Sequence, residues 1–182
     1  DKLTNSFFES VSGRTAGFSA SVTDMHEYTW IVMMMMMFIG GASGSTTGGM
    51  KVNTFGVLLA TVVSSIRGRP NVEAFRRQIP EQQVSLATTL FMLGIASILV
   101  VAFVLIMIED ARPLELVFEA VSAFGTNGNS TGITETLSMG GQLLIIFAMF
   151  AGKIGPLTIA LLLAQRRQPV RFSFAQDSVR IG

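Results

Sequence analysis

The chain has 182 residues, of which 49% are hydrophobic and only 14% are charged, and its formal net charge is +1. This composition is typical of a membrane protein, and the near-neutral charge gives no support to nucleic acid as a partner. Cysteine is absent, which excludes disulfides and thiolate metal sites.

A short motif occurs twice in the chain. Residues 8–12 (FESVS) lead to Thr-Ala-Gly at 15–17, and residues 118–122 (FEAVS) lead to Thr-Asn-Gly at 126–128. Each copy ends in Thr-x-Gly and precedes a long apolar segment. An internal repeat sets the architecture, so we expect two copies of one structural unit. The chain begins at Asp1 without a signal-peptide pattern, and we expect it to be a piece of a longer protein that starts on the outer face.

The first copy predicts a half-helix followed by an ion-binding loop. Residues 5–13 give about 13 Å of helix, roughly half of a ~30 Å hydrocarbon core. Such a helix can enter a membrane and turn back only where other protein surrounds it. Its C-terminal end favours a cation, and Thr-x-Gly can turn successive carbonyls toward one axis because Gly accepts positive φ. Rings of such carbonyls replace the hydration shell of K⁺. An amphipathic helix with a Gly C-cap is the commoner structure for one copy, but two copies favour the loop.

In chain order, residues 1–13 are the first half-helix and residues 14–20 its loop. Arg14 is either a surface side chain or a tether behind the loop. We assign no function to His26, the only histidine. Tyr28 and Trp30 open the next apolar segment, as aromatic residues do at the headgroup level. Five consecutive Met residues at 33–37 point around the whole helix, so they favour packing over metal binding.

The apolar segment from Tyr28 to Ile66 is interrupted by a run of small residues at 40–49. As one helix it would be about 58 Å long, nearly twice the length that the bilayer core requires. Irregular backbone at membrane depth is tolerated only inside protein or beside a water-filled cavity. We therefore expect residues 40–50 to line a pathway; a Gly/Ser linker is the alternative, which the apolar flanks disfavour.

The second half repeats this order. Residues 67–83 are rich in Arg, and basic loops face the cytoplasm. Residues 84–108 carry no charge and predict a spanning helix. Pro113 can begin the second half-helix, and residues 125–130 form its loop. Residues 142–165 are the last span, followed by a basic tail.

The repeat and the Gly-rich break together resemble the Trk/Ktr/HKT superfamily of potassium transporters, most closely the membrane subunits of bacterial Ktr systems. Members carry four repeats of outer helix, pore helix, filter loop and inner helix, and this chain resembles the last two without the third outer helix. The resemblance implies an all-α membrane protein with a K⁺-channel-like pore. Residues 1–66 would form the third repeat, 67–83 a cytoplasmic loop, 84–165 the fourth repeat and 166–182 a cytoplasmic C-terminal tail.

The resemblance implies K⁺ uptake, Na⁺-dependent, through a carbonyl-lined filter and past a gating loop, with no chemical step and no organic cofactor. Implied partners are a second identical membrane subunit and a cytosolic nucleotide-binding regulatory ring, and the location is the cell membrane, crossed several times. The filter residues, which would bind K⁺ through backbone carbonyls, are Thr15, Ala16, Gly17, Phe18, Thr126, Asn127, Gly128 and Asn129. The gate residues are Gly40, Gly41, Ala42, Ser43, Gly44, Ser45, Thr46, Thr47, Gly48, Gly49 and Lys153.

Two of these residues carry further expectations. Asn129 stands where the family usually has an apolar residue, which bears on K⁺ selectivity. Lys153 lies about 18 Å from the end of its span, too far to reach the interface. A cation at that depth usually faces the bundle interior, so we expect its ammonium to bind the oxygens of residues 41–48 and hold the loop closed.

The main alternative is an enzyme. Residues 41–44 match the Gly-x-Ser-Gly of rhomboid intramembrane proteases, with Ser43 as the nucleophile. Such a serine needs a general base, and the only histidine, His26, precedes the motif. A phosphate-binding P-loop also fails, because Met50 stands where Lys is required. A structural or adaptor membrane protein is a third class, which would not need the duplicated Thr-x-Gly.

Overall fold

The computed structural model describes residues 25–165 except residues 43, 46, 70 and 75, together with single positions at 4, 7, 8, 12 and 22; for residues 155–165 only the helical backbone is described. The first filter loop and the C-terminal tail therefore lie outside the described residues. The predicted site residues that are not described are Thr15, Ala16, Gly17, Phe18, Ser43 and Thr46.

Helices α2 (Glu27–Phe38) and α3 (Val52–Ile66) flank the Gly-rich segment, which is not helical. The backbone N–H of Gly40 donates to the carbonyl of Met50 at 2.7 Å, and Ile39 pairs with Met50 in an isolated bridge. Because these contacts bring the facing helix ends together, the residues between them form a closed loop. The interruption that the sequence predicts is present.

A two-stranded hairpin lies in the basic region after α3. Strands β1 (Glu73–Ala74) and β2 (Arg77–Gln78) are antiparallel, with Glu73 opposite Gln78. Arg69 forms an exposed ion pair with Glu73, which contributes little to stability at a solvated surface. The hairpin is the only strand structure in the described part of the chain, and it is a small departure from the all-α expectation.

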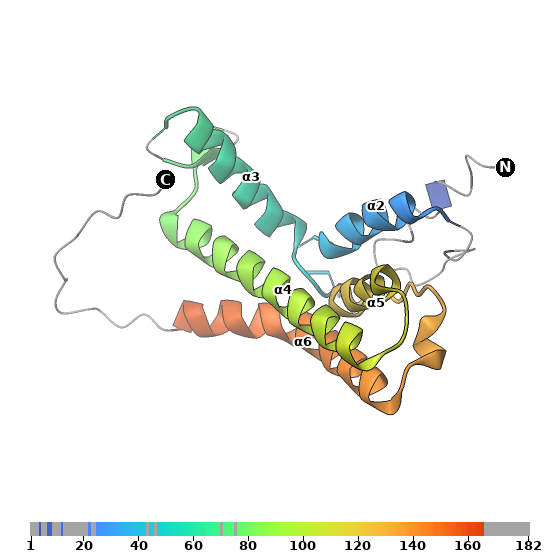
Figure 1. Ribbon diagram of the computed structural model, residues 1–182. Helices are drawn as coiled ribbons and strands as arrows, with labels where there is room; N and C mark the ends of the chain where they lie inside the picture. The colour runs from blue at the N-terminus through green and yellow to red at the C-terminus, as the bar shows by residue number, and fades with distance from the viewer. Residues whose placement is uncertain are drawn as a thin grey trace.

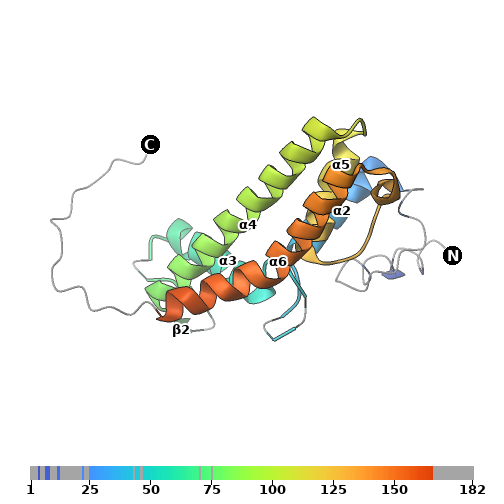
Figure 2. The same cartoon turned by 90° about the horizontal axis from the view of Figure 1, so that it is seen from below.

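The two long helices, α4 (Glu81–Ile108) and α6 (Met139–Gln165), lie side by side and run in opposite directions (Figures 1 and 2). By length and composition, α4 is the one helix in the described residues that can cross a membrane; α2, α3 and the part of α6 up to Ile154 are shorter apolar helices. Large apolar side chains stay exposed along α4 and α6, among them Leu99, Phe103, Phe147 and Phe150. Such a surface suits contact with lipid.

Helix α5 (Pro113–Gly125) is short and lies among the other helices (Figure 1), in contact with α2, α4 and α6. Every residue from Phe118 to Gly125 is buried. One apolar cluster joins α5 to α4 and α6 around Leu105 and Leu116, and a second joins it to α2, where the rings of Trp30 and Phe118 are 5.9 Å apart. After α5, an irregular segment and a 3-10 turn, η2 (Ile133–Thr136), lead into α6. The end of this buried helix is the centre of the candidate site.

Candidate functional site

The segment after α5 begins with a residue in an unusual conformation. Thr126, the C-cap, has φ 53° and ψ 39°, a left-handed geometry that β-branched residues rarely adopt. The N–H of Thr126 donates to the carbonyl of Ala123, and that of Asn127 donates to the carbonyl of Ser122. This helix ending usually has Gly at the left-handed position. The conformation of Thr126 costs about 1–3 kcal/mol and therefore depends on neighbours that fix it.

Positive φ recurs at Gly128, where φ is 87°, and this confirms the predicted conformation of that glycine. Residues 126 and 128 thus both have positive φ, with Asn127 between them. Among the described residues, no hydrogen bond ends on the carbonyl oxygens of residues 126–128. Three successive carbonyls with no partner among the described residues therefore lie just past the C-terminal end of α5, where the helix dipole favours a cation.

The two asparagines of this segment differ in their contacts. The carbonyl of Asn129 accepts a hydrogen bond from the hydroxyl of Ser122 at 2.5 Å, so this carbonyl faces α5. The side chain of Asn129 is buried, and neither of its polar atoms has a partner in the described structure. The side-chain amide of Asn127 donates to the carbonyl of Met37 at 3.2 Å. The second predicted filter loop is therefore attached to the end of α2.

The Gly-rich segment contacts the second predicted filter loop and α6. The backbone N–H of Gly48 donates to the hydroxyl of Thr126 at 2.8 Å. The N–H of Gly49 donates to the carbonyl of Gly152 in α6 at 3.1 Å. The structure thus brings the described residues of the predicted gate into direct contact with the second predicted filter loop and with the middle of α6.

Lys51 binds the Gly-rich segment from its C-terminal side. Its ammonium donates to the carbonyl of Ser45 at 3.0 Å and to both the carbonyl and the hydroxyl of Thr47. The same hydroxyl accepts from the N–H of Gly41 at 3.0 Å. Because an ammonium has three donors, these contacts use all of them. The motifs predict no role for Lys51, although its place as the first charged residue after the break is a usable signal.

Lys153 lies level with the loop but hydrogen-bonds to none of the loop residues that the structure describes. Its neighbour Gly152 accepts the hydrogen bond from Gly49, whereas the side chain of Lys153 is exposed and hydrogen-bonds to no described residue. The expected tie between the Lys153 ammonium and the oxygens of residues 41–48 is therefore not formed in this part of the chain. Lys51 makes the contact that was expected of Lys153.

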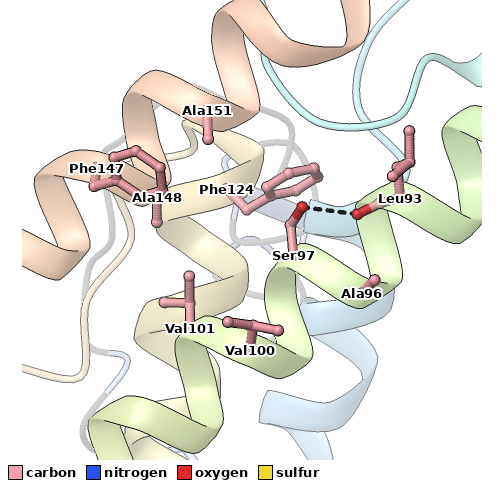
Figure 3. A pocket seen from close by; sticks show the side chains of 9 residues that line it. All are labelled: Leu93, Ala96, Ser97, Val100, Val101, Phe124, Phe147, Ala148 and Ala151. Atoms are coloured by element: carbon pink, nitrogen blue, oxygen red, sulfur yellow. Dashed lines mark hydrogen bonds between the residues drawn. The ribbon is translucent and has the colours of Figure 1, made fainter. Parts of the chain in front are cut away.

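An apolar cavity of about 270 Å³ lies between α4 and α6 and reaches the ring of Phe124 (Figure 3). The hydroxyl of Ser97 is already bonded to the carbonyl of Leu93 at 2.7 Å. The remaining lining side chains are apolar: Leu93, Ala96, Val100, Val101, Phe124, Phe147, Ala148 and Ala151. This cavity offers no ligands to an ion.

Side-chain metal sites and protease chemistry find no support in the described residues. No three His, Asp or Glu side chains there are grouped to hold a metal ion. His26 is exposed at the start of α2, and the segment that contains Ser43 follows the other end of that helix, about 18 Å away. Among the described residues, the oxygens that this region can offer to a cation are the backbone carbonyls of residues 126–128 and the unpartnered amide oxygens of Asn127 and Asn129.

Comparison with known proteins gives the family. A family model described as TrkH, cation transport protein, matches residues 1–173. The chain is 36% identical over its whole length to the potassium/sodium uptake protein NtpJ of Enterococcus hirae, of which it covers 42%. It is 39% identical over 92% of its length to the Ktr system potassium uptake protein B of Bacillus subtilis, of which it covers 38%.

The protein of the same name from Vibrio alginolyticus is 35% identical over 97% of the chain, which covers 39% of that relative. The chain therefore spans about two fifths of the length of these curated relatives. All three are named as uptake proteins, so the comparisons support transport and give no support to a rhomboid-like protease.

Proposed function

Because the chain belongs to the TrkH family of cation transport proteins, we propose that it forms part of a K⁺ uptake protein and carries two of its ion-conducting loops. The names of the relatives support K⁺ as the ion, and the name of NtpJ supports Na⁺ as a second ion. The most direct support is the run of three carbonyls at residues 126–128, which accept no hydrogen bond from any described residue and lie past the C-terminal end of buried α5. Such oxygens can replace the water around K⁺.

In this proposal α5 is a pore helix, α4 the outer helix and α6 the inner helix of one repeat. The carbonyls of Thr126, Asn127 and Gly128 bind the ion, and residues 15–18 take the same place in the preceding repeat. Asn129 is the weakest of the proposed ligands, because its carbonyl already accepts from Ser122.

The Gly-rich loop at 40–49 is the proposed gate. Its contacts with Thr126 and with Gly152 place it against both the filter loop and the inner helix. Lys51 holds it in a compact shape, and Lys153 adds a positive charge at the same level that opposes a passing cation. Opening requires at least the contacts of Gly48 and Lys51 to break.

The arrangement of the whole protein is also part of the proposal. Relatives named as components of a Ktr system support an assembly with further components, which we take to be a second membrane subunit and a cytosolic nucleotide-binding ring. The arginines of the region after α3 support a cytoplasmic location for this region, and with it for the C-terminal tail. Because the chain spans about two fifths of the length of these relatives, we take the full-length protein to contain two further repeats.

The test is ion competition in proteoliposomes that contain the full-length protein. Gly128→Ser forces a side chain onto a φ of 87°, and strain of about 1–3 kcal/mol at that point should displace the adjacent carbonyls. We expect the preference for K⁺ over Na⁺ to fall by about tenfold.

The matched control is Gly68→Ser. Gly68 also has positive φ, 63°, but an added Cβ there meets no atom within 4 Å, and the residue lies in the basic region after α3. This variant is expected to keep the parent preference. Equal preference in parent, control and Gly128→Ser would remove residues 126–128 from the filter.

A further inference from the structure

Glu119 is a buried acidic residue in the middle of α5, with only 4% of its surface exposed. A buried carboxylate is costly unless hydrogen bonds compensate for its lost hydration. Its Oε1 accepts from the hydroxyl of Ser130 at 2.6 Å and from the N–H and hydroxyl of Thr131 at 2.9 and 3.2 Å. Its Oε2 accepts from the hydroxyl of Thr134 at 2.9 Å. All four donors come from one short stretch, residues 130–134, which begins at the last residue of the predicted filter loop.

Ser122, one turn further along α5, makes a second contact between this helix and the segment that follows it. Residues three apart lie on the same face of a helix, and the hydroxyl of Ser122 donates to the carbonyl of Asn129. In the described structure, no backbone–backbone hydrogen bond joins residues 129–134 to α5. The chain that leaves the filter loop is thus hydrogen-bonded to α5 through the side chains of Glu119 and Ser122.

We propose that Glu119 is a positioning residue for ion selection: it fixes the outer limb of the filter loop, residues 129–134, and so sets the geometry of the carbonyls at 126–128. This inference rests on the proposed filter. Glu119 acts through the hydrogen bonds that its two oxygens accept at the length of a Glu side chain, and not through its negative charge. It does not touch the ion.

Two conservative substitutions distinguish the effect of the position of the Glu119 carboxylate oxygens from the effect of their negative charge. Glu119→Gln removes the charge but keeps one oxygen for the Oε1 donors, and its amide can donate to the hydroxyl of Thr134. Glu119→Asp keeps the charge but withdraws both oxygens by about one methylene, roughly 1.5 Å, so several hydrogen bonds are lost. If the position of the oxygens controls selectivity, the Gln variant retains more K⁺ over Na⁺ selectivity than the Asp variant. If the negative charge controls it, the Asp variant retains more than the Gln variant.

The experiment measures K⁺ and Na⁺ uptake by the full-length protein in proteoliposomes, at equal amounts of monodisperse protein. We expect Glu119→Asp to lose about tenfold in selectivity, because several hydrogen bonds to a charged group are lost and such bonds are stronger than neutral ones. We expect Glu119→Gln to lose clearly less. The matched control is Glu135, an exposed carboxylate in η2 that hydrogen-bonds to no described residue. Glu135→Asp and Glu135→Gln should both match the parent.

If both Glu119 variants lose selectivity, the double variant Ser130→Ala with Thr134→Val decides, because it removes donors and leaves the carboxylate in place. Lower selectivity in that variant supports the inference, and parent selectivity overturns it. Higher selectivity in Glu119→Asp than in Glu119→Gln, or parent selectivity in both, also overturns it. Parent selectivity in Gly128→Ser would instead overturn the filter assignment itself.

The internal repeat provides a second test. Glu9 and Ser12 occupy the positions of Glu119 and Ser122 in the first copy of the motif, and the side chain of Ser12 is buried. Glu9 lies outside the described residues, so its role is inferred from the sequence alone. Glu9→Asp should likewise reduce selectivity more than Glu9→Gln; the reverse order would confine the inference to the second copy.

Discussion

Gly152 allows α6 to approach the end of α5 at a distance that no other residue permits. A Cβ atom added at residue 152 would lie 1.9 Å from the carbonyl oxygen of Phe124, and 2.7 and 2.9 Å from its C and Cα atoms. Ordinary contact begins at 3.4 Å, so Gly152→Ala requires a backbone shift of about 1.5 Å in a close-packed interior. All three clashing atoms belong to the backbone, so no side-chain rotation can relieve them.

Two opposing free energies decide the effect of Gly152→Ala. Alanine favours a helix interior over glycine by about 1 kcal/mol, whereas overpacking typically costs about 1–3 kcal/mol and sometimes more. We expect overpacking to win and the free energy of unfolding to fall by up to about 2 kcal/mol. Because Phe124 precedes Thr126 by two residues, the shift should also move the proposed filter carbonyls and reduce K⁺ over Na⁺ selectivity.

Thermal denaturation of the purified full-length protein and ion competition in proteoliposomes measure the two effects. Gly56→Ala in α3 is the matched control, because a Cβ added there meets no atom within 4 Å; it should raise or preserve stability and leave selectivity unchanged. The reasoning is refuted if Gly152→Ala is as stable and as selective as Gly56→Ala.

Two further predictions concern the proposed gate, and both are measured as K⁺ flux in proteoliposomes. Lys51→Gln removes a charged donor from three loop oxygens and should raise flux several-fold. Lys153→Gln, at an exposed side chain that hydrogen-bonds to no described residue, should raise it less. A larger increase for Lys153→Gln would identify Lys153 as the residue that holds the gate. Thr126→Val leaves the N–H of Gly48 without its acceptor and should raise flux. Thr126→Ser keeps the acceptor, so its flux should stay near that of the parent. Equal flux in both variants would mean that the contact between Gly48 and Thr126 does not affect gating.

The order of helices was predictable because its signals are local. The Gly, Ser and Thr residues at 40–49 are poor helix formers, and the helix is interrupted there. Pro113 begins α5 as predicted, at a position where its missing N–H costs nothing. The start of α6 was predicted at Gln142 but lies at Met139, because Ser138 caps the helix by accepting from the N–H of Gly141 at 3.2 Å.

The contacts of the site were less predictable, because they join residues far apart in the chain. The bonds from Gly48 to Thr126 and from Asn127 to Met37 depend on how three segments meet, which periodicity does not specify. Lys153 was chosen for its depth in the span, but depth does not fix the direction of a side chain. Glu119 is visible in the sequence as a charge in the most apolar part of a half-helix, but the donors that satisfy it lie 11–15 residues further along the chain and are not specified by the motif.

The contact between Thr126 and Gly48 links the two parts of the proposed mechanism. Thr126 holds a costly left-handed conformation, and its hydroxyl accepts the N–H of Gly48 from the proposed gate. If the loop moves to admit an ion, this bond breaks and one of the contacts that fix Thr126 is lost. The carbonyl of Thr126 is then freer to reorient, so the first proposed ion ligand depends on the state of the gate. Selectivity measured with a closed loop and with a loop opened by Lys51→Gln should therefore differ, and equal selectivity in both states would mean that filter and gate act independently.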